Sequence, residues 1–159
     1  MTQNCCKRIA IFPGTFDPFT RGHYSIVNRA LDIFDEVVIA IGVNVQKRPM
    51  FSEEERVTML SQLYAGEPRV RVVSYSGLTV DVARECGAQF MLRGVRSVID
   101  FEYEKSIADV NREISGLETI MLFTEPMYAH ISSSVVRELL SYGHDVAHFL
   151  PEGLLLPHK

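Results

Sequence analysis

The sequence predicts a single α/β domain, residues 1–159, built on one Rossmann-like, doubly wound parallel sheet of five strands with helices on both faces. Short apolar segments alternate along the chain with longer segments in which apolar residues recur at intervals of three and four. Right-handed crossovers between such strands give a parallel sheet, for which we expect the strand order 3-2-1-4-5. Apolar residues make up 47% of the chain, enough to fill the core of one domain.

The expected strands are short, mostly apolar segments bounded by turn residues or charges. The segment at 36–41 is continuously apolar after its first residue, as a strand covered on both faces requires. The segment at 69–75 alternates more, which indicates a position near an edge of the sheet. In chain order, the expected strands cover residues 8–12, 36–41, 69–75, 90–92 and 118–123.

Each expected helix carries a signal at one of its ends. Thr20 is a suitable N-cap for the first helix, whose apolar stripe runs on to Phe34. Ser52 and Glu55 form a capping box for the second helix. The other expected helices run from about 79 to 86 with Gly87 as a left-handed cap, from Asp100 as N-cap to about Arg112, and from the serines at 132–134 to Gly143.

A turn rich in Gly and Pro, at residues 13–18, joins the first strand to the first helix. Such a turn exposes backbone N–H groups beside the positive end of the helix dipole, which suits a phosphate group. The helix opens with the pattern T-x-G-H, so Gly22 lets a phosphate approach the backbone and His23 can aim a ring N–H at it. Neither the dinucleotide-binding nor the P-loop signature occurs. Similar turns occur throughout α/β proteins, so the turn alone does not decide the function.

The expected topology brings this turn next to a second polar segment. In the order 3-2-1-4-5 the winding reverses between the first and fourth strands, and ligands bind at the carboxyl ends of strands beside such a reversal. Those ends carry residues 13–17 and 93–96, and the second segment has two arginines flanking a glycine and a valine. The sequence therefore predicts a nucleotide site between the two segments.

Net charge, cysteine content and the lack of a long apolar run restrict the partners and the compartment that we expect for this protein. The net charge is −4, which argues against a general nucleic-acid-binding protein and requires cations for a polyanionic ligand to be gathered locally. The three cysteines form neither a disulfide framework nor a metal-ligand pattern. No apolar run approaches membrane-spanning length and residues 1–12 lack the apolar core of a signal peptide, so we expect a cytoplasmic protein with no membrane partner. The candidate cations are Lys47, Arg48, Arg93, Arg96 and Arg137.

Four segments together carry a resemblance to a known family. They are residues 13–23, residues 47–51 followed by Glu55 and Arg56, residues 93–96 followed by 100–104, and residues 131–134. In this order and spacing they resemble the T/H-x-G-H nucleotidyltransferases, and among them the bacterial phosphopantetheine adenylyltransferases. The resemblance covers nearly the whole chain.

The resemblance implies a nucleotidyltransferase of coenzyme A biosynthesis that transfers the adenylyl group of ATP, with Mg²⁺, to 4′-phosphopantetheine. The products would be dephospho-coenzyme A and pyrophosphate, formed by direct in-line attack without a covalent enzyme intermediate. ATP and 4′-phosphopantetheine are the expected partners, and no nucleic acid is expected. The resemblance also implies a homohexamer, in which helix faces such as that of Val135, Leu139 and Leu140 would be partly covered.

The same resemblance assigns roles to individual residues. The catalytic residues would be His23, Lys47 and Arg96, and no metal ligand is assigned. Thr15, Lys47, Thr79 and Arg93 would bind 4′-phosphopantetheine. The ATP-binding residues would be Thr15, Phe16, His23, Gly94, Val95, Arg96, Glu104, Tyr128, Ala129, His130, Ile131, Ser132, Ser133 and Ser134.

Some of these residues have simpler interpretations that the sequence leaves open. The serines at 132–134 can serve only to cap a helix, and Arg93 and Arg96 can be ordinary surface cations. Glu104 can form a helix-surface salt bridge. Val45 and Gln46 depart from the family pattern, which leaves the pose of the Lys47 loop open.

Three alternative functions also remain. The acceptor could be nicotinate mononucleotide, glycerol phosphate or pantoate, in a related transferase. A non-catalytic nucleotide or coenzyme A sensor could share the fold, although both His23 and Lys47 are present. A synthetase-like fragment is disfavoured, because no lysine-serine loop follows the last expected strand.

Overall fold

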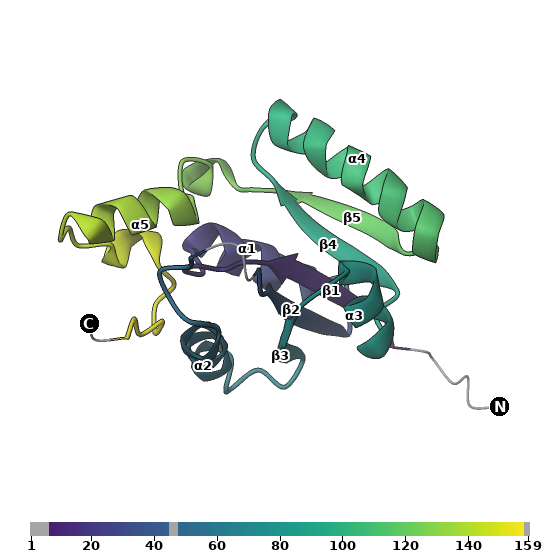
Figure 1. Ribbon diagram of the computed structural model, residues 1–159, viewed down its shortest axis with the longest axis horizontal. Helices are drawn as coiled ribbons and strands as arrows, with labels where there is room; N and C mark the ends of the chain where they lie inside the picture. The colour runs from purple at the N-terminus through teal and green to yellow at the C-terminus, as the bar shows by residue number, and fades with distance from the viewer. Residues whose placement is uncertain (1–6, 45–47, 158–159) are drawn as a thin grey trace.

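The computed structural model describes residues 7–44 and 48–157, which form one sheet with helices packed around it (Figure 1). The strands are all parallel and follow the order β3-β2-β1-β4-β5, so the predicted fold class and strand order are confirmed. The strands are β1 (Ile9–Gly14), β2 (Glu36–Gly42), β3 (Val70–Tyr75), β4 (Phe90–Val95) and β5 (Glu118–Phe123). The helices are α1 (Arg21–Ala30), α2 (Glu53–Leu63), α3 (Thr79–Glu85), α4 (Val98–Ser115) and α5 (Ser133–Ser141), with 3-10 turns η1 (Pro126–Tyr128) and η2 (Ala147–Phe149).

The two central strands that lead to the site continue further than their apolar sequences indicate. β1 extends to Gly14 and β4 extends to Val95. Their pairing continues because Gly14 lies opposite Ile41 of β2 and Val95 lies opposite Phe123 of β5. Backbone pairing does not require apolar side chains, so these ends stay in the sheet. Arg93 is therefore held within a strand.

Two helix boundaries differ from the sequence prediction. α1 ends at Ala30, and Phe34 packs into the core from the connection to β2. The prediction of Asp100 as the N-cap of α4 was wrong, because Ser97 fills that position and its Oγ accepts a hydrogen bond from the N–H of Asp100 at 3.1 Å. Asp100 instead lies in the first turn of α4, where its carboxylate is available for other contacts.

The remaining helix signals are confirmed. Ser52 and Glu55 form the predicted capping box at the start of α2. Ser132 caps α5 by accepting a hydrogen bond from the N–H of Val135 at 3.2 Å. Gly87 has a φ of 71°, as a left-handed cap requires.

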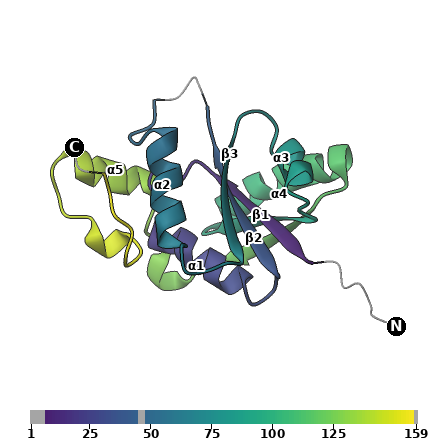
Figure 2. The same ribbon diagram turned by 90° about the horizontal axis from the view of Figure 1, so that it is seen from below.

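The helices lie on both faces of the sheet. Figure 2 shows α1 and α2 on one side, and α3 and α4 on the other. Successive residues of β1 therefore point into different cores: Phe12 packs with Ile26 and Leu60, whereas Ile11 packs with Val80 of α3. β1 is thus buried on both faces and fixes the origin of the turn that follows it.

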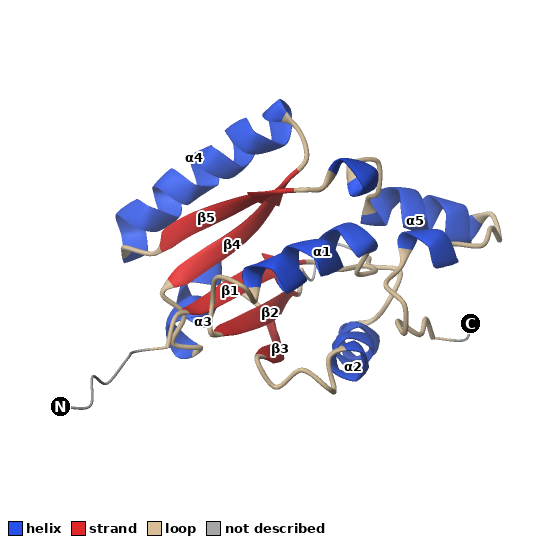
Figure 3. Cartoon of the chain, turned by 180° about the vertical axis from the view of Figure 1, so that it is seen from behind, coloured by secondary structure: helices blue, strands red, loops and turns tan. Residues whose placement is uncertain are grey.

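The two C-terminal helices differ in how much of their apolar surface the chain covers. Seen from behind in Figure 3, α5 lies beyond the ends of the strands, and Figure 2 shows it on the same side of the sheet as α1 and α2. Its Leu139 and Leu140 pack partly against a third core cluster that includes Phe51 and Val146, so the chain itself covers much of the α5 face that we expected to need a partner. α4 instead leaves a set of large apolar side chains exposed, namely Val98, Ile99, Phe101, Tyr103, Ile107, Val110 and Ile114.

Among residues 7–44 and 48–157, no helix combines the length and the apolar composition needed to cross a membrane.

Candidate active site

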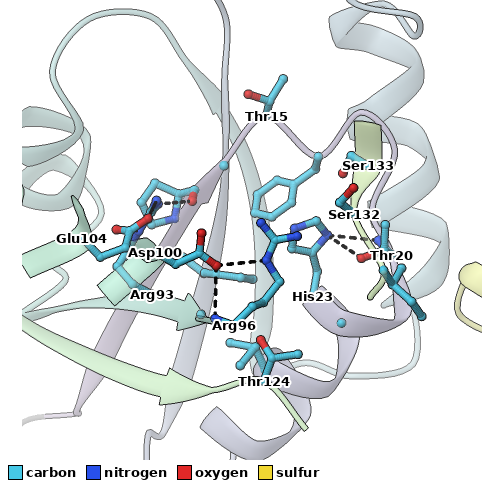
Figure 4. Close-up of a pocket in the computed structure, with 18 of the residues that line it drawn as sticks. Thr15, Thr20, His23, Arg93, Arg96, Asp100, Glu104, Thr124, Ser132 and Ser133 are labelled. Carbon is cyan, nitrogen blue, oxygen red and sulfur yellow. Dashed lines mark hydrogen bonds and ion pairs between the residues drawn. The ribbon is translucent and has the colours of Figure 1, made fainter. Parts of the chain in front are cut away.

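A cavity of about 410 Å³, which we call the main cavity, lies at the carboxyl ends of β1 and β4, where the sequence predicted a nucleotide site (Figure 4). It brings together the turn after β1, the start of α1, the end of β4, the start of α4 and the start of α5. The predicted site residues that line it are Thr15, Phe16, His23, Arg93, Gly94, Arg96, Glu104, Ile131, Ser132, Ser133 and Ser134.

A second cavity, of about 720 Å³, adjoins the first on the β2 and β3 side. Thr79 lines it, and its hydroxyl lies 2.9 Å from the hydroxyl of Tyr75. Thr15 and Arg93 line both cavities, so these two residues mark the boundary between them. The arrangement can hold two ligands that meet beside the turn.

Four predicted residues lie elsewhere. The side chain of Val95 is buried and lines a separate apolar cavity near the start of α4. Tyr128 lines a separate cavity beside α1, whereas Ala129 and His130 are exposed outside the main cavity. Lys47 lies outside the described residues.

The turn after β1 has a strained backbone that a bulky residue occupies. Phe16 has a φ of 49°, a left-handed conformation that costs a non-glycine residue about 1–3 kcal/mol. Its ring is buried over Gly14, where a Cβ would lie only 2.7 Å from the ring, so glycine is required at that position. The same ring meets the imidazole of His23 edge-on, at 5.1 Å between centroids. The strained turn therefore places the Phe16 ring where it packs against the imidazole of His23.

The T-x-G-H motif holds His23 through a local hydrogen bond. The N–H of Thr20 donates to Nδ1 of His23 at 3.1 Å, the position that a glutamate fills in a capping box. Because a backbone N–H can only donate, Nδ1 must be unprotonated and the ring proton resides on Nε2. Burial, with the nearby charges of Arg96 and Arg93, lowers the pKa of His23 from 6.5 to about 4. His23 is thus a neutral donor at neutral pH.

Backbone N–H groups of the turn are also available to a ligand. Within the described part of the chain, the N–H groups of Thr15 and Phe16 donate to no acceptor. They lie close to the N-terminus of α1, where the helix dipole is positive. These two N–H groups and the Nε2–H of His23 are uncharged hydrogen-bond donors that can bind an anion.

The two arginines of the site are each held by a carboxylate of α4. Arg93 forms a two-pronged ion pair with Glu104, at 2.6 Å and 2.5 Å, and donates to the carbonyl oxygen of Pro13 at 2.8 Å. Arg96 donates from Nε and from its backbone N–H to Asp100, at 3.1 Å and 3.2 Å. In Figure 4 the side chains of Arg96 and His23 extend toward each other. Glu104 therefore orients Arg93 through a salt bridge, but the pair is largely buried between α4 and β4 and is not the helix-surface salt bridge that the sequence left open.

The three serines at the start of α5 have separate partners. Ser132 is the helix cap, Ser133 donates to the carbonyl oxygen of Pro18 at 2.8 Å, and Ser134 accepts from Arg137 at 3.1 Å. All three also line the main cavity. Capping explains Ser132 alone, and the other two hydroxyls lie beside the ligand space.

Sequence reasoning missed some residues that line the cavity. Asp100 had been assigned to helix capping, although its spacing of four residues from Arg96 on a helix start could have indicated an ion pair. Thr20 and Thr124 also line the cavity. Thr124 follows the last strand and carries no sequence signal that would single it out.

The chain is similar to known nucleotidyltransferases, which is consistent with a nucleotide site at this position. A family model described as cytidylyltransferase-like matches residues 11–139. A phosphopantetheine adenylyltransferase from Phocaeicola vulgatus is 60% identical over 147 residues, which cover 92% of this chain and 97% of the relative. The protein of the same name from Porphyromonas gingivalis is 56% identical over 150 residues, which cover 94% of this chain and 98% of the relative.

The chain belongs to the phosphopantetheine adenylyltransferase family.

A solved structure supports the fold at greater distance. A bifunctional NMN adenylyltransferase/ADP ribose pyrophosphatase from Francisella tularensis superposes with a TM-score of 0.70 at 18% identity. The match covers 91% of this chain but only 45% of that protein, so the chain spans about half of its length. The likeness shows that the Rossmann-like nucleotidyltransferase fold is shared, whereas the specific family follows from the curated relatives.

Proposed function

We propose that this phosphopantetheine adenylyltransferase family member transfers the adenylyl group of ATP to 4′-phosphopantetheine, forming dephospho-coenzyme A and pyrophosphate. The single observation that carries the proposal is the 60% identity to a relative of that name across almost the whole length of both chains. The site supports it, because neutral donors and arginines converge on one space at the carboxyl ends of β1 and β4.

The proposed mechanism is a direct in-line displacement. A phosphate oxygen of 4′-phosphopantetheine attacks the α-phosphorus of ATP, the bond from that phosphorus to the bridging oxygen breaks, and pyrophosphate leaves. The attacking phosphate is already ionised, so the enzyme needs neither a nucleophile of its own nor a strong base. Catalysis then consists of positioning the reactants and stabilising charge.

The described residues divide these tasks. Nε2 of His23 would donate to the α-phosphate as its charge grows, and Arg96 would neutralise charge on the triphosphate. ATP would occupy the main cavity, between Gly94 and the serines of α5. The nucleotide substrate would be the magnesium complex of ATP, since Mg²⁺ is commonly bound through substrate phosphates.

The second cavity suits the other substrate. Thr79 lines it, and Arg93 and Thr15 stand at its junction with the main cavity. We place the phosphate of 4′-phosphopantetheine at this junction, with the pantetheine arm extending toward Thr79. Lys47, which the family resemblance assigns to catalysis and to this phosphate, keeps that proposed role.

The direct test is to incubate the protein with ATP, Mg²⁺ and one acceptor at a time, and to weigh the products. With 4′-phosphopantetheine we expect dephospho-coenzyme A and one equivalent of pyrophosphate. Removal of Mg²⁺ with a chelator should stop the reaction. Turnover of nicotinate mononucleotide or glycerol phosphate instead would show a different transferase, and tight coenzyme A binding without turnover of any acceptor would show a sensor.

We also propose that the chain forms a homohexamer. We propose further that it acts in the cytoplasm, the compartment that contains its proposed substrate ATP. The exposed apolar side chains of α4 offer a surface for contact with another copy, and Val110 is 55% exposed there. Val110→Asp should leave the monomer folded and reduce the mass measured by light scattering to a fraction of the wild-type value. Ile33→Asp, at an exposed position outside α4, is the matched control. A wild-type protein that is monomeric at micromolar concentration would refute the hexamer.

A further inference from the structure

The carbonyl oxygens of the turn at residues 15–18 are held by side chains that come from other parts of the chain. Three of them accept a hydrogen bond from α2 or α5. The bonds join Arg56 to Thr15 O at 2.7 Å, Arg137 to Asp17 O at 2.7 Å, and Ser133 to Pro18 O at 2.8 Å. The turn is therefore fixed from outside by long-range contacts, and not by its own sequence alone.

Arg56 is unusual because it is a charged residue in the core. The residue is only 2% exposed, and its side chain donates hydrogen bonds to the main-chain oxygens of Thr15, Gly42 and Ser52. Within the part of the chain that the structure describes, no carboxylate forms an ion pair with it. A buried guanidinium is costly, so its use as a donor to carbonyls beside the turn indicates a specific task.

Arg137 approaches the same turn from α5. One guanidinium nitrogen donates to Asp17 O, and Nε lies 3.9 Å from the Asp17 carboxylate. That carboxylate, buried in the core, accepts the N–H groups of Met50 and Phe51 at 2.8 Å each. Asp17 thus ties the turn to the segment before α2, and Arg137 ties it to α5.

The turn needs such support because its backbone is in an unfavourable conformation. Phe16 has a φ of 49°, and its ring forms part of the wall behind His23. Strained backbone persists only where the surroundings determine it from several sides. If the carbonyl contacts were lost, the turn would relax, and the N–H groups of Thr15 and Phe16 and the ring of His23 would lose their alignment.

We propose that Arg56 and Arg137 are positioning residues for adenylyl transfer, which hold the turn at residues 15–18 so that its donors and His23 face the reacting phosphates. Neither residue needs to touch a substrate for this role. The proposal rests on the proposed function for its kinetic consequence, but the arrangement of the turn can be measured without turnover.

The experiment compares Arg137→Met with Arg137→Lys, Arg56→Met and Arg56→Lys. Arg137→Met should lower kcat by roughly 10- to 100-fold with KM for ATP within about three-fold, since small misplacements of reacting groups have effects of this size. Arg137→Lys keeps a cation and an N–H donor and should recover most of kcat. Arg29→Met is the matched control, because Arg29 also donates to a carbonyl oxygen, that of Phe123 at 2.6 Å, but away from the turn.

A second readout uses the histidine ring resonances in NMR spectra. The ring of His23 lies 5.1 Å from Phe16 and 5.3 Å from Phe19, between centroids, so its proton shifts report the packing of the turn. They should move in Arg137→Met and stay unchanged in Arg29→Met. Their assignment comes from the spectrum of His23→Gln.

The outcomes separate the two proposals. A folded Arg137→Met with wild-type kcat, or with an unmoved His23 resonance, would overturn the positioning role. A loss of kcat that only follows a loss of folded protein would overturn it as well. If Arg56→Met does not fold, Arg137→Met decides, because the Arg137 side chain is 35% exposed and the buried carboxylate of Asp17 keeps its hydrogen bonds from the N–H groups of Met50 and Phe51. An inactive wild type would refute the proposed function, while the NMR comparison would still test the turn.

Discussion

The two walls of the site hold their hydrogen-bond donors in position in different ways. The turn wall, residues 13–23, consists of backbone N–H groups and a neutral histidine that a short local motif holds in place. The arginine wall, residues 93–104, consists of full charges, each held by a carboxylate on the first turns of α4. Neutral donors aligned in advance suit charge that appears in the transition state, whereas arginines suit phosphates that are charged throughout. We therefore expect the turn wall to govern kcat, and the arginine wall to govern substrate binding and the stability of the fold.

The largest effect is expected at the turn wall. His23→Ala removes a donor whose bond strengthens as charge develops, so kcat should fall ~100- to 1000-fold while KM for ATP changes only a few-fold. Steady-state kinetics with both substrates varied is the measurement. His144→Ala, at an exposed histidine that does not line the cavity, is the control. A His23→Ala variant with nearly wild-type kcat would remove His23 from catalysis.

A smaller effect, on a different quantity, is expected at the arginine wall. Arg93→Met leaves the buried carboxylate of Glu104 without its cation, which should lower the free energy of unfolding by about 3 kcal/mol. It should also raise KM for 4′-phosphopantetheine. Urea unfolding and kinetics measure the two effects.

The double variant Arg93→Met with Glu104→Met separates them. It removes the unpaired buried charge, so stability should return while the raised KM persists. If KM returned together with stability, Arg93 would have only a structural role.

The pH dependence of stability tests the neutral histidine. The folded protein keeps the pKa of His23 at about 4, whereas the value without the fold is 6.5. Because the folded pKa is the lower one, the unfolded chain binds the proton first as pH falls, and stability is lost over this interval. Between about pH 7.5 and about pH 5 the contribution of His23 should fall by about 2 kcal/mol. Denaturant unfolding of wild type and His23→Gln at both values gives the difference, in which the other histidines cancel. Equal pH slopes for the two proteins would refute a neutral His23 ring with a lowered pKa.

The smallest effect is expected from Asp100→Asn. Its ion pair with Arg96 is partly exposed and worth at most about 1 kcal/mol, so stability should change little. Release of the guanidinium should lower KM for ATP by about two- to three-fold. Asp109→Asn, which breaks an exposed ion pair with Lys105 on the same helix, is the control. A raised KM would show that the carboxylate helps to orient Arg96 for the phosphates.

Much of this architecture could be predicted from local patterns. The strand at 118–123, the capping box at Ser52 and the T-x-G-H turn are contiguous features, and the structure has each of them where the sequence placed it. Asp100 was misassigned because an acid near a helix start fits either a cap or an ion pair with Arg96, and only the backbone position of Ser97 distinguishes the two. The Lys47 prediction lies outside the described residues and stays a prediction.

The sequence by itself determined the positions of the strands, most of the helix starts, the strand order and the two main segments that meet at the site, because periodicity, capping and crossover handedness follow from local sequence. Only the tertiary structure decided which carboxylate holds each arginine and which side chains hold the turn. Arg56 and Arg137 reach the turn across 41 and 120 residues of sequence. No local pattern encodes such contacts, because they depend on how separate helices pack around the end of β1.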